Sequence, residues 1–118
     1  MNLADFLTDT TARIPDHPAI RFEGESVTFA EMNERVDALA HGLVRSGLNP
    51  GDFCVSMMPD SPYWPMVYYA LAKVGAVVVP VNFLYRRGEL EHIFRDSGAA
   101  AFIRIFQKLP CWDFLMPI

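Results

Sequence analysis

The sequence predicts an α/β fold in which helices alternate with mostly parallel strands. From Thr28 onward the predicted order is helix, strand, helix, strand, helix, strand. This order is typical of βαβ units with right-handed crossovers. Residues 76–81 form a nearly continuous β-branched run, which is typical of a parallel strand covered on both faces. With 118 residues, the chain forms one domain at most, or part of one.

The start of the chain predicts one helix and one hairpin. Asn2 is a good N-cap, and apolar residues recur at helical spacing until the Pro-rich segment 15–18 ends the helix. Residues 19–23 alternate between apolar and polar side chains, as a half-buried strand does. A two-residue loop with Gly24 in its first position, which requires a positive φ, connects them to a return strand at residues 26–28.

The next helix has the strongest local signal. Thr28 and Glu31 fit a capping box, in which the Thr28 hydroxyl accepts from the Glu31 amide and the carboxylate reaches back. Gly47 suits the position just after the helix, and residues 49–52 predict a turn with Pro and Gly at its centre. One apolar stripe is expected to face inward: Met32, Val36, Leu39 and Leu43.

A buried strand and another helix follow. Residues 53–58 are a short apolar run bounded by turn signals, which favours a buried strand. Ser61 is placed to cap the next helix, with Pro62 at its first position, and Gly75 ends it. The expected inward face of this helix consists of Val67, Ala70, Leu71 and Val74.

The last regular elements are a helix at residues 88–96, with Leu90, Ile93 and Phe94 inward, and a strand at residues 99–103. After them, residues 104–118 follow no clear period and are rich in apolar side chains, whereas a solvated tail is usually polar. We therefore divide the chain into residues 1–103 and a divergent tail, 104–118, that is expected from truncation or an altered reading frame. The alternative is that the tail covers a gap on the domain surface.

Composition and charge exclude several classes of protein. Ten Lys+Arg against 14 Asp+Glu give a net charge of −4, which argues against a nucleic-acid binder because such proteins carry a basic stripe. Hydrophobic residues make up 52% of the chain, which excludes a disordered polar tail. Two cysteines, Cys54 and Cys111, are too few for a disulfide scaffold. Reduced thiols in a cytoplasmic protein are expected.

No targeting or transmembrane segment is expected. The first residues lack a basic region and a long apolar stretch. The nearest approach to a membrane span is residues 63–83, where Lys73 is the only charge, and its length would suffice. Pro65, Gly75 and Pro80 interrupt this stretch, so a buried helix–strand pair is the better interpretation.

Few residues suggest catalysis. The glycines form no Gly-x-Gly-x-x-Gly fingerprint. Gly42 and Gly47 have the glycine spacing of a P-loop, but the Lys-Ser/Thr pair is missing after them, so a helix end explains them better. Cys54 lies in a predicted core strand and is expected to act as a small hydrophobe. The histidines have no partner at metal-ligand spacing: His17, His41 and His92.

Two other groups of residues allow a functional and a structural interpretation. Arg86 and Arg87 precede a predicted helix, where they could bind a phosphate of a ligand such as coenzyme A; the alternative is a solvated surface pair. Four aromatic residues could form a stacking platform, but no basic groove accompanies them, which favours helix packing: Tyr63, Trp64, Tyr68 and Tyr69.

Five blocks, in order and at compatible spacing, resemble a known family. They are Val27-Thr28-Phe29-Ala30-Glu31-Met32-Asn33 with Ala38-Leu39-Ala40; Gly47-Leu48-Asn49-Pro50-Gly51-Asp52; Met58-Pro59-Asp60-Ser61; Ala70-Leu71-Ala72-Lys73-Val74-Gly75-Ala76-Val77 with Pro80-Val81-Asn82; and Glu89-Leu90 with Asp96-Ser97-Gly98-Ala99. Over residues 3–103 the chain resembles the N-terminal part of the acyl-CoA synthetases, which are AMP-binding, adenylate-forming enzymes. Fatty-acyl and aryl-CoA ligases look nearest.

The resemblance implies the incomplete N-terminal portion of the large domain of an adenylate-forming enzyme. Members of the family use ATP and magnesium to convert a carboxylate into an acyl-adenylate with release of pyrophosphate. The thiol of coenzyme A then displaces AMP. For the full-length enzyme the implied cofactors are therefore ATP, Mg²⁺ and CoA, and the implied substrate is a fatty or aryl carboxylic acid.

The functional motifs of that family lie downstream of the matched blocks. They are its phosphate-binding loop, its adenine-binding segment, its ribose-binding Asp and its catalytic Lys, and none has a matching position in this sequence. No catalytic, cofactor-binding or metal-binding residue is therefore assigned. The chain alone is expected to be inactive and to bind no cofactor.

Two alternatives stay open. The chain could be a stand-alone interaction module without catalysis, in which uncovered apolar surface leads to self-association. It could also be a fragment of an amino-acid adenylation domain, since the acyl pocket is not represented in the matched blocks.

Overall fold

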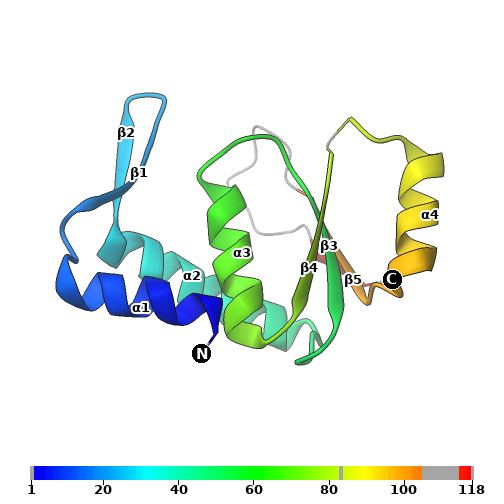
Figure 1. Ribbon diagram of the computed structural model, residues 1–118, viewed down its shortest axis with the longest axis horizontal. Helices are drawn as coiled ribbons and strands as arrows, with labels where there is room; N and C mark the ends of the chain where they lie inside the picture. Colours follow the sequence, from blue (N-terminus) through cyan, green and yellow to red (C-terminus); the bar gives the residue numbers. More distant parts are fainter. Residues whose placement is uncertain (1, 83, 105–114, 118) are drawn as a thin grey trace.

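The computed structural model describes residues 2–82, 84–104 and 115–117. A hairpin and three helices lie on one side of a four-stranded sheet, and a fourth helix lies on the other side (Figure 1). The elements in chain order are α1 (Leu3–Arg13), β1 (Pro18–Phe22), β2 (Glu25–Thr28), α2 (Phe29–Arg45), β3 (Phe53–Met57), α3 (Tyr63–Val74), β4 (Val77–Val81), α4 (Arg87–Ser97), β5 (Ala101–Arg104) and β6 (Leu115–Pro117).

The sheet confirms the predicted α/β class. Its strand order is β4-β3-β5-β6, and β3 pairs in parallel with both β4 and β5. The connection from β3 to β4 through α3 and the connection from β4 to β5 through α4 run in opposite directions across the sheet. Right-handed crossovers of this kind place their helices on opposite faces, as α3 and α4 are seen in Figure 1.

The helix ends lie close to where local chemistry predicts them. Asn2 and Asp5 form a reciprocal capping box at the start of α1. At the start of α2, the Glu31 N–H donates to Thr28 Oγ1 at 3.1 Å. After α2, the N–H groups of Gly47 and Leu48 donate back into the last turn, which is a Schellman motif that requires the positive φ of Gly47, 100°.

The start of α3 differs from the prediction. Pro62, in a helical conformation, occupies the cap position of α3, and no side chain caps this end. Ser61, the expected cap, instead contributes its backbone carbonyl, which accepts from the Trp64 N–H at 3.2 Å. Its buried hydroxyl has no hydrogen-bond partner among the described residues.

The hairpin loop is shifted by one residue from its predicted place. Phe22 pairs with Glu25, so the two loop residues are Glu23 and Gly24. Both have positive φ, 50° and 81°, which is the type I′ geometry favoured by the twist of paired strands. Gly24 therefore occupies the second loop position, and the prediction that it comes first is wrong.

One face of the sheet carries the main core of the protein. Alternate side chains of the parallel strands point toward α3, and Cys54, Ala101 and Ile103 on this face are buried. The helix α3 packs on the sheet, and α1 and α2 pack on α3. The central helix therefore contributes five buried side chains: Met66, Val67, Ala70, Leu71 and Val74.

The opposite face is much less covered than predicted. Its buried cluster contains Val55, Ala99 and Phe102 among the described residues. The helix α4 buries none of its side chains fully, and it meets the sheet mainly where Phe94 contacts Phe102 edge-on, with ring centroids 5.2 Å apart. The prediction that the β-branched strand is covered on both faces is therefore wrong for this chain, because β4 lies at the sheet edge and is half exposed.

Part of the divergent tail joins the sheet. Arg104 is the last residue of β5, and residues 115–117 form β6, which pairs antiparallel with β5. Residues 105–114, with Cys111, lie outside the described residues. Within the described ranges, no helix has both the length and the apolar character needed to cross a bilayer. The stretch considered for a span forms α3 and β4 instead.

Candidate functional site

Ligands of parallel α/β sheets bind at the carboxyl ends of the strands, so these ends are the first place to look for a site. β3 leads into Asp60 and Ser61, β4 leads into Asn82, and β5 ends at Arg104. The Asn82 side chain accepts a hydrogen bond from the Leu84 N–H at 2.9 Å, which satisfies the turn after β4. This bond gives Asn82 a local structural role.

Arg86 and Arg87, at the N-terminus of α4, both have hydrogen bonds to neighbouring carboxylates. Arg87 Nε donates to Glu91 Oε1 at 2.7 Å, and the Arg86 N–H donates to Glu89 Oε2 at 2.7 Å. A carboxylate therefore already occupies the N-terminus of α4, where an anion is favoured. The Arg87 side chain is 91% exposed, so the geometry favours a solvated surface pair over a phosphate site.

Cys54 has the properties of an inert core residue. Its side chain is fully buried, and this desolvation raises the pKa of the thiol to about 12, although the backbone of Ile103 opposes the shift through a hydrogen bond. A nucleophilic or metal-binding cysteine needs the opposite shift. Among the described residues, no three His, Cys, Asp or Glu side chains come together as a metal site.

The aromatic residues of α3 pack along the helix. Trp64 and Tyr68 are one helical turn apart, and their ring centroids are 4.6 Å apart with an interplanar angle of 30°. Tyr69 packs against the main core. This arrangement agrees with helix packing.

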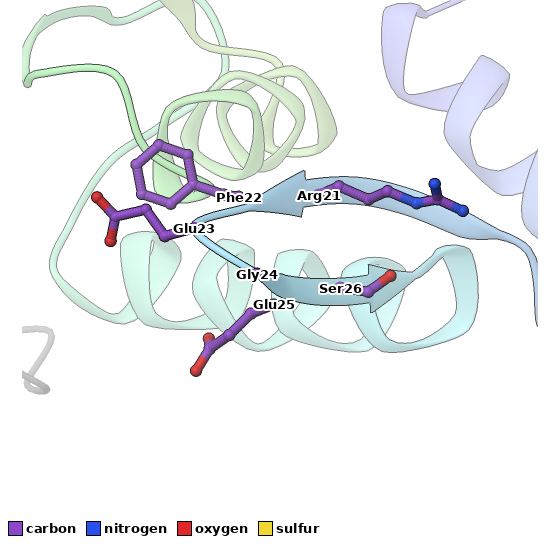
Figure 2. Close-up of a pocket in the computed structure, with 6 residues that line it drawn as sticks. All are labelled: Arg21, Phe22, Glu23, Gly24, Glu25 and Ser26. Carbon is purple, nitrogen blue, oxygen red and sulfur yellow. The ribbon is translucent and has the colours of Figure 1, made fainter.

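The hairpin tip carries a hollow of 460 Å³, and its lining consists of residues 21–26. Figure 2 shows that the side chains of Arg21, Phe22, Glu23 and Glu25 spread in different directions from the hairpin. Substrate sites need polar groups that converge on one point. This hollow therefore does not have the form of a catalytic site.

The best-developed polar cluster joins α2 to α3. Lys73 Nζ donates to Asn33 Oδ1 at 2.9 Å and makes an ion pair with Asp37. The Lys73 side chain is 19% exposed and that of Asp37 is 50% exposed. A partly buried ammonium with two partners fixes the register of two helices. The sequence marks Lys73 as a charge in an apolar stretch and as part of a family block, but it gives no sign of either partner, because both lie on another helix.

We expect Asp37→Ala to lower the free energy of unfolding by about 1–2 kcal/mol, since it leaves the Lys73 ammonium partly buried beside Asn33 alone. The expected loss in free energy of unfolding is smaller than for a fully buried ion pair because the Asp37 side chain is half exposed. Glu91→Ala, which breaks the exposed pair with Arg87, is the matched control and should cost about 0.5 kcal/mol or less. Urea unfolding followed by circular dichroism measures both; equal losses would contradict the role of the cluster.

Comparison with known proteins assigns this chain to a family. A model of the AMP-binding enzyme family matches residues 7–112. The chain belongs to the AMP-binding enzyme family. The N-terminal subdomain of NpsA from Klebsiella oxytoca, solved with 3-hydroxyanthranilyl-AMSN, has a TM-score of 0.84 and 30% sequence identity, covering 87% of this chain and 26% of that chain. The observed fold is thus that of the N-terminal part of an adenylate-forming enzyme.

Curated relatives include three kinds of family member. The long-chain-fatty-acid–CoA ligase of Escherichia coli O6:H1 is 39% identical over 103 residues, which are 86% of this chain and 18% of the ligase. Feruloyl-CoA synthase from an Amycolatopsis species is 40% identical over 93 residues, 78% of this chain and 19% of the synthase. Triostin synthetase I from Streptomyces triostinicus is 35% identical over 100 residues, 85% of this chain and 19% of the synthetase. The chain thus spans about a fifth of the length of these relatives.

Proposed function

We propose that this chain is the N-terminal segment, residues 1–103, of an ATP-dependent acid–thiol ligase and is inactive by itself. The observation that carries the proposal is the family match over residues 7–112 combined with a set of described residues that forms no convergent polar site. The similarity to a long-chain-fatty-acid–CoA ligase and to a feruloyl-CoA synthase supports a fatty or aryl carboxylic acid as the substrate of the complete enzyme.

In the complete enzyme, the reaction would join a carboxylate to ATP, release pyrophosphate and pass the acyl group from AMP to the thiol of coenzyme A. ATP supplies the leaving group, and Mg²⁺ neutralises phosphate charge during this chemistry. The described residues of this chain do not fit these groups, since no three of their His, Cys, Asp or Glu side chains come together and the sequence contains no glycine-rich phosphate-binding motif. No step is therefore assigned to a residue of this chain. A cytoplasmic location belongs to the same proposal, and the free, buried thiol of Cys54 is compatible with it.

Exchange of labelled pyrophosphate into ATP tests the inactivity directly. The purified chain is incubated with ATP, Mg²⁺ and either a long-chain fatty acid or ferulate, and the full-length Escherichia coli relative serves as the positive control. We expect exchange at the level of the enzyme-free blank for this chain and clear exchange for the relative with its fatty acid. Acid-dependent exchange by the chain alone would overturn the proposal.

A fragment of an amino-acid adenylation domain is the second candidate, and the similarity to triostin synthetase I favours it. Both candidates share the adenylation step and differ in the acid. The two alternatives predict different acid substrates. Pyrophosphate exchange by an intact enzyme that carries this segment, measured with fatty, aryl and amino acids in parallel, therefore distinguishes them.

A further inference from the structure

The strand β5 has a second neighbour in the sheet because residues 115–117 pair with it. The strand order is β4-β3-β5-β6. β3 pairs in parallel with β4 and β5, whereas β6 pairs antiparallel with β5. Three residue pairs form this ladder: Ala101↔Pro117, Phe102↔Met116 and Ile103↔Leu115. β6 therefore places β5 inside the sheet and becomes the outer strand itself.

The backbone of β5 needs a partner on this side. Ala101 and Ile103 belong to the main core on one face, and Phe102 belongs to the cluster on the other face. All three are at most 7% exposed. Alternate residues of a strand direct their N–H and C=O groups to opposite neighbours, so β3 can satisfy only part of this backbone. Buried backbone groups without a partner cost free energy, and β6 lies where that partner is needed.

The two outer strands carry prolines, and the two inner strands carry none. Pro80 lies in β4 and Pro117 lies in β6, whereas β3 and β5 contain no proline. The Val77 N–H donates to Asp52 O at 2.8 Å, next to β3, so Pro80 is three residues further on and is directed away from β3. Proline blocks the extension of a sheet at its edge. The positions of the prolines therefore agree with a sheet that ends at β4 and at β6.

We propose that the outer edge of β5 is a strand-binding site, which residues 115–117 occupy within the same chain and thereby close. The site takes an extended, antiparallel segment of apolar residues through main-chain pairing. Any other strand, from a partner or from a second copy, has to displace β6 first. The inference goes beyond the proposed function and does not depend on it, since it concerns how the chain closes its own sheet.

A second copy of this chain is the competing source of the strand. Residues 105–114 separate β5 from β6, and antiparallel strands can be joined by as few as two residues, so the connection within one chain is long enough. Pairing within one chain also benefits from an effective concentration of about a millimolar. Each copy carries a net charge of −4, which opposes the approach of two identical chains. These considerations favour the chain's own strand.

Amide hydrogen exchange followed by NMR tests the proposal on the full chain. Leu115→Pro/Met116→Pro, the double-proline variant, removes at least one N–H directed at β5, because two consecutive residues direct their N–H groups to opposite sides. We expect alternate amides of residues 101–103 to exchange about a hundredfold faster in this variant, while the others change by less than about threefold. Leu115→Ala/Met116→Ala keeps both N–H groups, so this matched control should stay within about tenfold of the unmodified chain.

Two measurements on the unmodified chain need no variant. Backbone NOEs between Phe102 and Met116 report the antiparallel pairing, and sedimentation velocity reports whether the chain is a monomer. A monomer with these NOEs supports closure within one chain. Equal exchange in the double-proline variant and the unmodified chain would overturn the proposal, as would unprotected alternate amides of β5 in the unmodified chain. NOEs that appear only in a dimer would assign the strand to a second copy and would also overturn it.

Discussion

Replacing Leu71 with alanine is expected to lower the free energy of unfolding by about 2–5 kcal/mol, since buried leucines lose both transfer free energy and packing when truncated. Leu71 is fully buried and lies on α3, the helix that packs between the sheet and the other helices of the main core. A loss of this size is a large fraction of the stability of a small domain. Urea unfolding monitored by circular dichroism measures it.

Leu84→Ala is the matched control, because it removes the same atoms from a residue that is 71% exposed. A surface truncation of this kind should change the free energy of unfolding by about 0.5 kcal/mol or less. If both variants lost similar stability, the main core would not be organised around α3. If Leu71→Ala is too unstable to purify, Leu71→Met offers a milder test, with an expected loss under about 1.5 kcal/mol.

The thiol of Cys54 is expected to resist alkylation in the native protein by about a thousandfold compared with the unfolded chain. Burial raises its pKa to about 12, whereas an ordinary cysteine has a pKa of about 8.5, and only the thiolate reacts. The variant Cys111→Ser leaves Cys54 as the single thiol, since the sequence contains two cysteines. Iodoacetamide labelling at pH 8, with and without guanidinium, measures the ratio by mass spectrometry.

The same pKa predicts the direction of the pH dependence. The folded chain retains the Cys54 proton up to about pH 12, and the unfolded chain releases it near pH 8.5. The contribution of the protonated Cys54 thiol to the free energy of unfolding is therefore complete below pH 8.5 and is lost progressively as the pH rises toward 12. In Cys54→Ala, this part of the loss of stability at alkaline pH should be absent. Native labelling as fast as that of the unfolded chain would contradict the burial of Cys54.

Local chemistry made much of the fold predictable from the sequence. Asn2 and Thr28 cap their helices, and Gly47 and Gly75 end theirs with positive φ, because these preferences depend on a few neighbouring residues. The apolar stripe of α2 and the inward face of α3 were also predictable, since each follows the helical period.

Features that depend on distant partners were not predictable in the same way. The β-branched sequence of β4 predicts burial on both faces, but β4 is half exposed because burial depends on what packs against it. The interaction of Lys73 with Asp37 joins residues on two helices, so no local pattern indicates it. The absence of reactive groups from this chain stays a prediction of the sequence.

The central claim is that this chain is a scaffold segment whose reactive groups are contributed by the rest of an AMP-binding enzyme. The chimera of residues 1–103 with the downstream part of the Escherichia coli ligase tests it most directly, through acid-dependent exchange of pyrophosphate into ATP. We expect exchange within about tenfold of the parent ligase, because the proposed function assigns no catalytic group to the replaced segment and a tenfold change corresponds to only about 1.4 kcal/mol. A folded chimera without any exchange, alongside an active parent, would contradict it.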